Sequence, residues 1–172
     1  AKSSKNKNCG IHFYVDDYQF ERVWNYPEKY IDILEKSFII FRLGSYSRNQ
    51  RNELKSSRKI FFWDLGIRNA IIGNLSQIEN RADAGELWEN FVIAERLKKN
   101  AYSGSFALSY FWRTRQQNEI DYIEEEDGKL SSFEFKWNER KANVKCPEVF
   151  KNAYPETTFK VITPKNIEEF LM

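Results

Sequence analysis

The side chains that could do chemistry gather in one stretch of the sequence, NEIDYIEEEDGKLSSFEFKW, at residues 118–137. Asp127-Gly128 in its middle is the strongest kind of short signal for a two-residue hairpin turn. Polar and apolar residues alternate on both sides of this turn, as expected for two paired strands. The stretch therefore predicts a β-hairpin. Its candidate functional side chains are Glu119, Asp121, Glu134 and Lys136.

The turn predicts which residues of the hairpin oppose each other. If the turn takes two residues, Asp121 lies directly opposite Glu134, and Glu119 lies directly opposite Lys136. Because side chains alternate across a strand, these four are expected on one face. The apolar residues between them are expected together on the other face, which is a core face: Ile120, Tyr122, Phe133 and Phe135.

Facing carboxylates on a sheet need a positive charge between them, because two bare carboxylates repel each other. A divalent ion held by oxygen ligands, Mg²⁺ or Mn²⁺, would supply it, with Lys136 beside it. This combination suits phosphodiester hydrolysis, in which the metal activates a water and the lysine orients it or stabilises developing charge. The alternative is a solvated outer face, which we expect for Glu124-Glu125-Glu126. Apolar neighbours such as Phe135 and Trp137 favour the functional interpretation.

The composition excludes several other classes of protein. The chain has 172 residues with 27 Lys+Arg and 25 Asp+Glu, and it is long enough for one domain with a small appendage. His12 is the only histidine, which excludes His-based triads and two-His zinc sites. No G-x-x-x-x-G-K-[ST] loop is present, and the apolar runs are too short to span a bilayer. Two cysteines are too few for a disulfide scaffold, so a reducing, cytoplasmic setting is expected.

Helices and strands alternate along the rest of the chain, which predicts an α/β fold with a central mixed sheet. A helix over 27–36, a strand over 37–43, a basic loop and a strand over 59–64 resemble half of a winged-helix module. We expect a leader and this small segment in residues 1–58, and an α/β domain in residues 59–172. The elements expected in that domain are helices over 65–73, 84–100, 147–154 and 165–172, and strands over 106–114 and 158–164, besides the hairpin.

The pattern D-x(12)-E-x-K from Asp121 to Lys136 resembles the PD-(D/E)-x-K nuclease superfamily. Longer strings at 59–73, 81–98 and 110–137 are similar to the C-terminal region of a prokaryotic AAA-type ATPase family, catalogued as domain of unknown function 4143. The resemblance covers about Tyr30 to Met172. It implies a restriction-endonuclease-like core with an ATPase module upstream in the same polypeptide. Since the only methionine is Met172, the chain is expected to be a piece of a longer protein.

The resemblance also implies roles for particular residues. Asp121 and Glu134 match the motif acids and Lys136 the motif lysine, although Ile120 stands where the motif has proline. The superfamily uses a further acid from the helix before the core strands. Glu89 is the matching position, with Glu86 as the second choice. Asp121, Glu134 and Glu89 are thus the expected metal ligands.

Basic and amide side chains near the motif could contact DNA. Arg113, Arg115, Gln116 and Gln117 could contact phosphates, or an arginine here could pair with the acidic hairpin edge. A basic stretch could bind a nucleic-acid backbone or form a solvated loop: Arg48, Arg51, Lys55, Arg58 and Lys59. The leading expectation is a metal-dependent DNA nuclease acting as effector domain of an ATPase. The alternative is a non-catalytic DNA- or protein-binding regulatory module.

Overall fold

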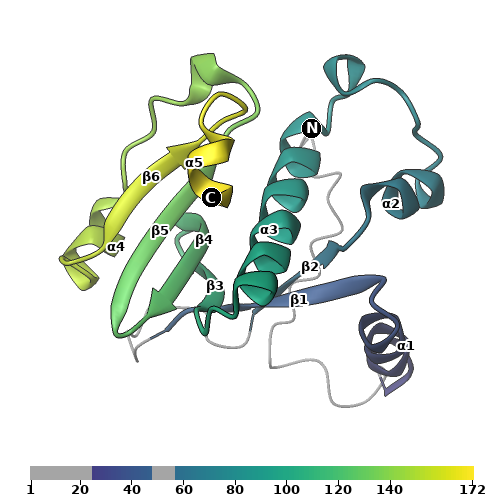
Figure 1. The fold of residues 1–172 in the computed structure, drawn as a ribbon, viewed down its shortest axis with the longest axis horizontal. Helices are drawn as coiled ribbons and strands as arrows, with labels where there is room; N and C mark the ends of the chain where they lie inside the picture. Colours follow the sequence, from purple (N-terminus) through teal and green to yellow (C-terminus); the bar gives the residue numbers. More distant parts are fainter. Residues whose placement is uncertain (1–24, 48–56) are drawn as a thin grey trace, which may run out of the picture.

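The protein is described by a computed structural model over residues 25–47 and 57–172 (Figure 1). The helices are α1 (Asn25–Lys36), α2 (Leu65–Ile71), α3 (Ala84–Ser103), α4 (Glu148–Ala153) and α5 (Ile167–Leu171), with short 3₁₀ turns at Ile78–Asn80 and Glu139–Lys141. The strands are β1 (Ile40–Ser45), β2 (Arg58–Phe62), β3 (Leu108–Arg113), β4 (Glu119–Glu126), β5 (Lys129–Phe135) and β6 (Thr158–Ile162). The expected α/β alternation is confirmed.

Within the described residues, the strands form one six-stranded mixed sheet in the order β2-β1-β3-β4-β5-β6. The β1–β3 and β5–β6 pairs are parallel, and the other pairs are antiparallel. The long helix α3 lies across one face, with β4, β5 and β6 on its left and α1 and α2 on its right in Figure 1. No helix in this part of the chain is both long and apolar enough to cross a membrane.

Two apolar clusters, one on each face, hold the layers together. Under α3, Trp88, Val92 and Ile93 pack with side chains from the strands and with Phe170 of α5. On the opposite face, Phe150 of α4 packs with a second set of strand residues: Trp112, Ile120, Ile123 and Leu130. Burying both faces of the central strands makes any polar group at their ends costly unless it is paired.

The expected winged-helix-like segment is not a separate layer. Its two strands, β1 and β2, extend the same sheet, and the expected domain boundary between residues 58 and 59 falls inside β2. Asn90 of α3 covers the edge of β2, since its side chain accepts from the backbone N–H of Phe62 at 3.0 Å and donates to the carbonyl of Phe62 at 2.6 Å. Helix α1 is joined to β1 by Arg42, which forms ion pairs with three acids: Glu28, Asp32 and Glu35.

The hairpin register is confirmed from Glu126↔Lys129 to Tyr122↔Phe133. Asp127 and Gly128 have φ of 51° and 75°, so both turn residues are left-handed, as the tight turn requires. On the other side of β4, Tyr110 pairs with Ile123 but Trp112 pairs with Ile120. The strand β4 thus has one extra residue there, a β-bulge.

The bulge makes one prediction wrong. Ile120 and Tyr122 were expected on one face, but Ile120 packs in the α4 cluster and Tyr122 in the α3 cluster. An extra residue inverts the alternation of side chains on one side of it. Asp121 lies between these two residues, at the bulge itself.

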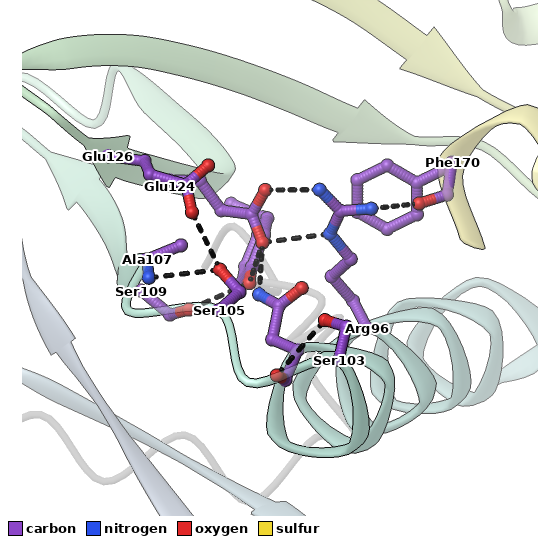
Figure 2. A network of polar contacts seen from close by, with 10 residues as sticks. Arg96, Ser103, Ser105, Ala107, Ser109, Glu124, Glu126 and Phe170 are labelled. Atoms are coloured by element: carbon purple, nitrogen blue, oxygen red, sulfur yellow. Dashed lines mark hydrogen bonds and ion pairs between the residues drawn. The ribbon is translucent and has the colours of Figure 1, made fainter. Parts of the chain in front are cut away.

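Glu124, expected on a solvated face, is instead buried at the centre of a polar network under α3 (Figure 2). Arg96 donates to both of its carboxylate oxygens, at 2.8 and 2.6 Å. Asn100 and the Tyr122 hydroxyl donate to one of them at 2.7 and 2.9 Å. Burial alone would raise the pKa of Glu124, but Arg96 and Asn100 hold that pKa below its usual value. The network ties the C-terminal half of α3 to β4.

The Arg96→Met variant should be strongly destabilised. It leaves the Glu124 carboxylate buried without its counter-ion, and breaking a buried pair in this way costs roughly 3–5 kcal/mol. The matched control is Lys98→Met on the same helix, because the Lys98–Glu95 pair (2.7 Å) is about one-third exposed and such pairs contribute about 0.2–1 kcal/mol. Urea unfolding at pH 7 measures both. Equal losses of unfolding free energy in the two variants would show that the Arg96–Glu124 pair is no more important for stability than a partly exposed pair.

Candidate functional site

The candidate site lies where β4 and β5 separate, just beyond the last paired residues of the hairpin. Asp121, in the bulge of β4, accepts a hydrogen bond from the backbone N–H of Phe135 at 2.9 Å. Burial, reinforced by the charge of Glu89, raises the pKa of Asp121 to about 7, although Lys59 and the Phe135 N–H act in the opposite direction. The carboxylate is thus held at a backbone position that β-pairing would otherwise occupy.

Glu134 and Lys136 form an ion pair on β5 and the residues after it. Lys136 Nζ lies 2.6 Å from Glu134 Oε1, and both side chains are partly buried. The backbone N–H of Lys136 donates to the carbonyl of Ile162 at 2.9 Å, which fixes this end to β6. Burial and the charge of Asp121 raise the pKa of Glu134. The charge of Asp121 raises the pKa of both Glu134 and Lys136, so the three side chains lie within electrostatic range of one another. Their shared role as a site stays a prediction.

The four hairpin side chains expected on one face, Glu119, Asp121, Glu134 and Lys136, do not form the pairs that this arrangement predicts. Phe133 and Phe135 both pack under α3, so Glu134 between them points to the opposite face. Glu119 was expected to lie opposite Lys136, but it pairs with other residues. It lies 2.5 Å from Lys59 Nζ and 3.5 Å from Arg113. The bulge is the physical reason, because it offsets the start of β4 from the register that the turn sets.

Glu89, the acid expected from the preceding helix, lies on α3 with its carboxylate 2.8 Å from Lys59 Nζ. Its charge raises the pKa of Asp121, so it belongs to the same electrostatic group. Glu86 lies in the first turn of α3. Among the described residues no ion pair joins Glu86 to the site, so Glu89 is the better of the two candidates.

Lys59 is the site residue that sequence reasoning missed. It was grouped with a basic loop, but its side chain is only 3% exposed and contacts both Glu89 and Glu119. The signal was available: Ser57, just before β2, and Lys59 and Phe61 within it alternate along the chain, and all three are buried. A lysine in the inward positions of an apolar strand needs an acidic partner in the core. Arg58 is exposed as expected, while Arg48, Arg51 and Lys55 lie outside the described residues.

The side chains expected to contact DNA lie at the start of the hairpin. Arg113 forms an ion pair with Glu119 and a hydrogen bond with Gln117, which matches the alternative interpretation of an arginine on the acidic edge. Arg115 and Gln116 are exposed. Gln117 has a φ of 67° in the turn before β4. DNA contact by Arg113, Arg115 and Gln117 remains a prediction.

The side chains present suit a hard divalent cation by their chemistry. Two partly buried carboxylates, Asp121 and Glu134, have raised pKa values, mainly because they are buried and also because an acid lies nearby, Glu89 for Asp121 and Asp121 for Glu134. Within residues 25–47 and 57–172, however, no group of three or more His, Cys, Asp or Glu side chains is arranged to hold a metal ion. Glu89, the third expected ligand, is turned toward Lys59.

Asp121 should make the metal-free protein less stable as the pH rises from about 4 to 7. Its pKa is about 7 in the folded state and near 3.8 in the unfolded chain. The folded state therefore holds a proton that the unfolded state has lost, and stability falls by at most about 1.4 kcal/mol per pH unit across this window. Above pH 7 the dependence should level off. Urea unfolding in chelator, comparing wild type with Asp121→Asn, measures the difference.

Asp127→Asn is the control for this comparison, because Asp127 is exposed in the hairpin turn and Asn tolerates its left-handed backbone. The free energy of unfolding of Asp127→Asn should depend on pH as it does in wild type. If the free energies of unfolding of wild type and Asp121→Asn change with pH in parallel, Asp121 is ionised like a surface acid.

Comparisons with known proteins place the chain in a family without a known function. A model described as Domain of unknown function (DUF4143) matches residues 84–169, a narrower part than the expected resemblance. Two further models of unknown function, DUF8612 and DUF4417, match residues 26–78 and 1–44. Uncharacterized proteins of Mycobacterium tuberculosis and Mycobacterium bovis are each 27% identical over 110 residues, or 63% of this chain. The matched region spans 24% of their length.

No solved structure matches this chain. The DUF4143 match alone covers half of the 172 residues and contains every motif residue, from Glu89 on α3 to Lys136 after β5. The chain belongs to the DUF4143 family.

Proposed function

We propose that this domain is a metal-dependent DNA nuclease of the PD-(D/E)-x-K type. The observation that carries the proposal is the electrostatic coupling of Asp121 to the Glu134–Lys136 ion pair, where β4 and β5 separate. Burial raises the pKa values of both carboxyl groups. Groups with strongly shifted pKa values cluster at functional sites.

The order of elements supports a restriction-endonuclease-like core. Helix α3, the strands β3, β4 and β5, helix α4 and strand β6 follow one another, with β6 parallel to β5. The nuclease superfamily takes one acid from the helix before its core strands, and Glu89 on α3 occupies that position. This order of elements and the place of Glu89 support the proposal.

Asp121 and Glu134 would hold the metal ion, Mg²⁺ or Mn²⁺, with Glu89 as the third acid. A bound ion would polarise the scissile phosphate and make a water nucleophilic at neutral pH. Lys136 would orient that water or stabilise the charge that develops on the phosphate, since its ammonium lies within 2.6 Å of Glu134. Arg113, Arg115 and Gln117 would position the DNA strand through its phosphates.

One observation favours a second candidate, a non-catalytic module that binds DNA or another protein. Glu89, Glu119 and Glu134 each have a lysine partner within the chain. Most of the charge in the site is therefore compensated without a metal ion, which a purely structural site would also require.

The chain matches a region that makes up only 24% of two longer relatives, which fits a domain that works as part of a larger polypeptide. We propose an AAA-type ATPase module upstream as the partner, with DNA as the substrate. In this arrangement the ATPase would act on or move DNA, and the domain described above would be its effector.

Mn²⁺-dependent nicking of supercoiled plasmid tests the proposal. We expect wild type to nick, Asp121→Ala and Glu134→Ala to lose activity, and Lys136→Ala to lose on the order of 10²–10³-fold, the usual effect of removing one group that stabilises transition-state charge. Lys136→Ala should remain folded, because its side chain lies at the edge of the site and is 28% exposed. Melting curves of every variant check this.

Lys98→Ala serves as the control, since this lysine pairs with Glu95 elsewhere on α3. Equal nicking by wild type and Lys136→Ala would remove the role assigned to the lysine. Suppose instead that wild type fails to bind Mn²⁺ and to nick any form of DNA, and yet binds DNA or a partner protein. This result would rule out the nuclease proposal in favour of the binding module.

A further inference from the structure

A buried lysine from one edge of the sheet reaches into the candidate site. Lys59 lies on β2, the edge strand, while its partner Glu119 lies on β4, with β1 and β3 between them in the sheet order. Its side chain must therefore extend across the sheet beneath α3. On the way its ammonium lies 5.3 Å from the ring centroid of Phe111 on β3. Contact with an aromatic face favours the charged form of lysine.

The ammonium of Lys59 occupies the point at which three carboxylates converge. It lies 2.8 Å from Glu89 and 2.5 Å from Glu119, and it also interacts electrostatically with Asp121. Burial would lower the pKa of Lys59, but these acids together raise it above its usual value. The lysine is therefore a permanent cation inside the site at neutral pH.

We propose that Lys59 is a positioning residue that competes with a divalent metal ion for Glu89, and thereby sets how tightly the site binds metal. This inference rests on the proposed function. Metal ions bind carboxylates through the same oxygen lone pairs that accept from an ammonium. While Glu89 is paired with Lys59, Asp121 and Glu134 remain as the two acids available to the ion.

The competition has a consequence that a purely structural lysine would not have. Removing the ammonium leaves Glu89 without its cation and Glu119 with Arg113 alone, and it adds negative charge next to Asp121. A divalent ion is then attracted more strongly and gains up to two further oxygen ligands. The loss of Lys59 should thus strengthen metal binding even as it destabilises the metal-free fold. Loss of a residue that only supports the site would weaken metal binding.

Calorimetric titration of Mn²⁺ into the full chain tests the inference. Lys59→Met should bind Mn²⁺ about 5- to 150-fold more tightly than wild type, the usual range for coupling between two ligands. Lys59→Arg keeps the positive charge and should bind like wild type. Lys98→Met, which removes a partly exposed lysine of α3 that pairs with Glu95, should also bind like wild type. Mn²⁺ should raise the melting temperature of Lys59→Met more than that of wild type.

The double variant Lys59→Met/Glu119→Gln serves if Lys59→Met alone does not fold. It removes one charge of each sign and still frees Glu89, so tighter binding is again expected. Affinity equal to or weaker than wild type in the folded variant would overturn the inference. If wild type binds no Mn²⁺, the proposed metal pair of Asp121 and Glu134 fails. The Lys59 inference is then decided separately: Mn²⁺ binding gained by the variant supports it, and none overturns it.

Discussion

Every charge beneath α3 needs a partner, and the rest of the structure depends on this constraint. It arises because α3 lies over a sheet that is covered on both faces. Arg96 and Glu124 meet this need in the C-terminal half of the helix, with Asn100 and Tyr122 completing the shell. Glu89 and Lys59 meet it in the N-terminal half. Buried ion pairs contribute little net stability compared with apolar residues, but breaking one is expensive. They therefore fix where α3 sits on the strands.

The position of α3 matters for the candidate site because two sets of ion pairs connect this helix to the strand β4. Arg96 binds Glu124 on β4, and Lys59 joins Glu89 on α3 to Glu119 on β4. Between Glu119 and Glu124 the strand contains its bulge, and the bulge holds Asp121. The two ion-paired ends thus place the bulge under the helix, and the Phe135 N–H holds the Asp121 carboxylate toward β5.

Local signals in the sequence were enough for most of the fold. Asp127-Gly128 fixed the hairpin register down to Tyr122↔Phe133, because a two-residue turn with left-handed backbone allows one pairing. The register failed for Glu119, since a bulge depends on the neighbouring strand β3 and has no signature in β4 alone. Glu124 was misjudged for a related reason. Three successive acids look solvated, but alternation turns one of them inward, and its partner Arg96 is 28 residues away.

Lys59 pairs with acids that are distant from it in the sequence. Its burial could have been inferred from the alternation along β2, but its partners could not, because they lie on α3 and β4. Contacts between distant elements depend on the order of strands in the sheet. Here β1 pairs with β3 in parallel, and no local sequence pattern predicts that pairing. The segment that seemed to precede the domain therefore supplies one of the charges in its candidate site.

The balance of charge explains why Asp121 stands apart from the other acids. Four carboxylates meet three cations here: Glu89, Glu119, Asp121 and Glu134 against Lys59, Lys136 and Arg113. Among the described residues, Asp121 makes no ion pair within hydrogen-bonding distance, and its pKa is the one raised to about 7. Either a proton or a cation can neutralise this remaining charge. A proton does so below pH 7, so a divalent ion and a proton compete for the same carboxylate, and metal binding should be favoured as the pH rises above that value.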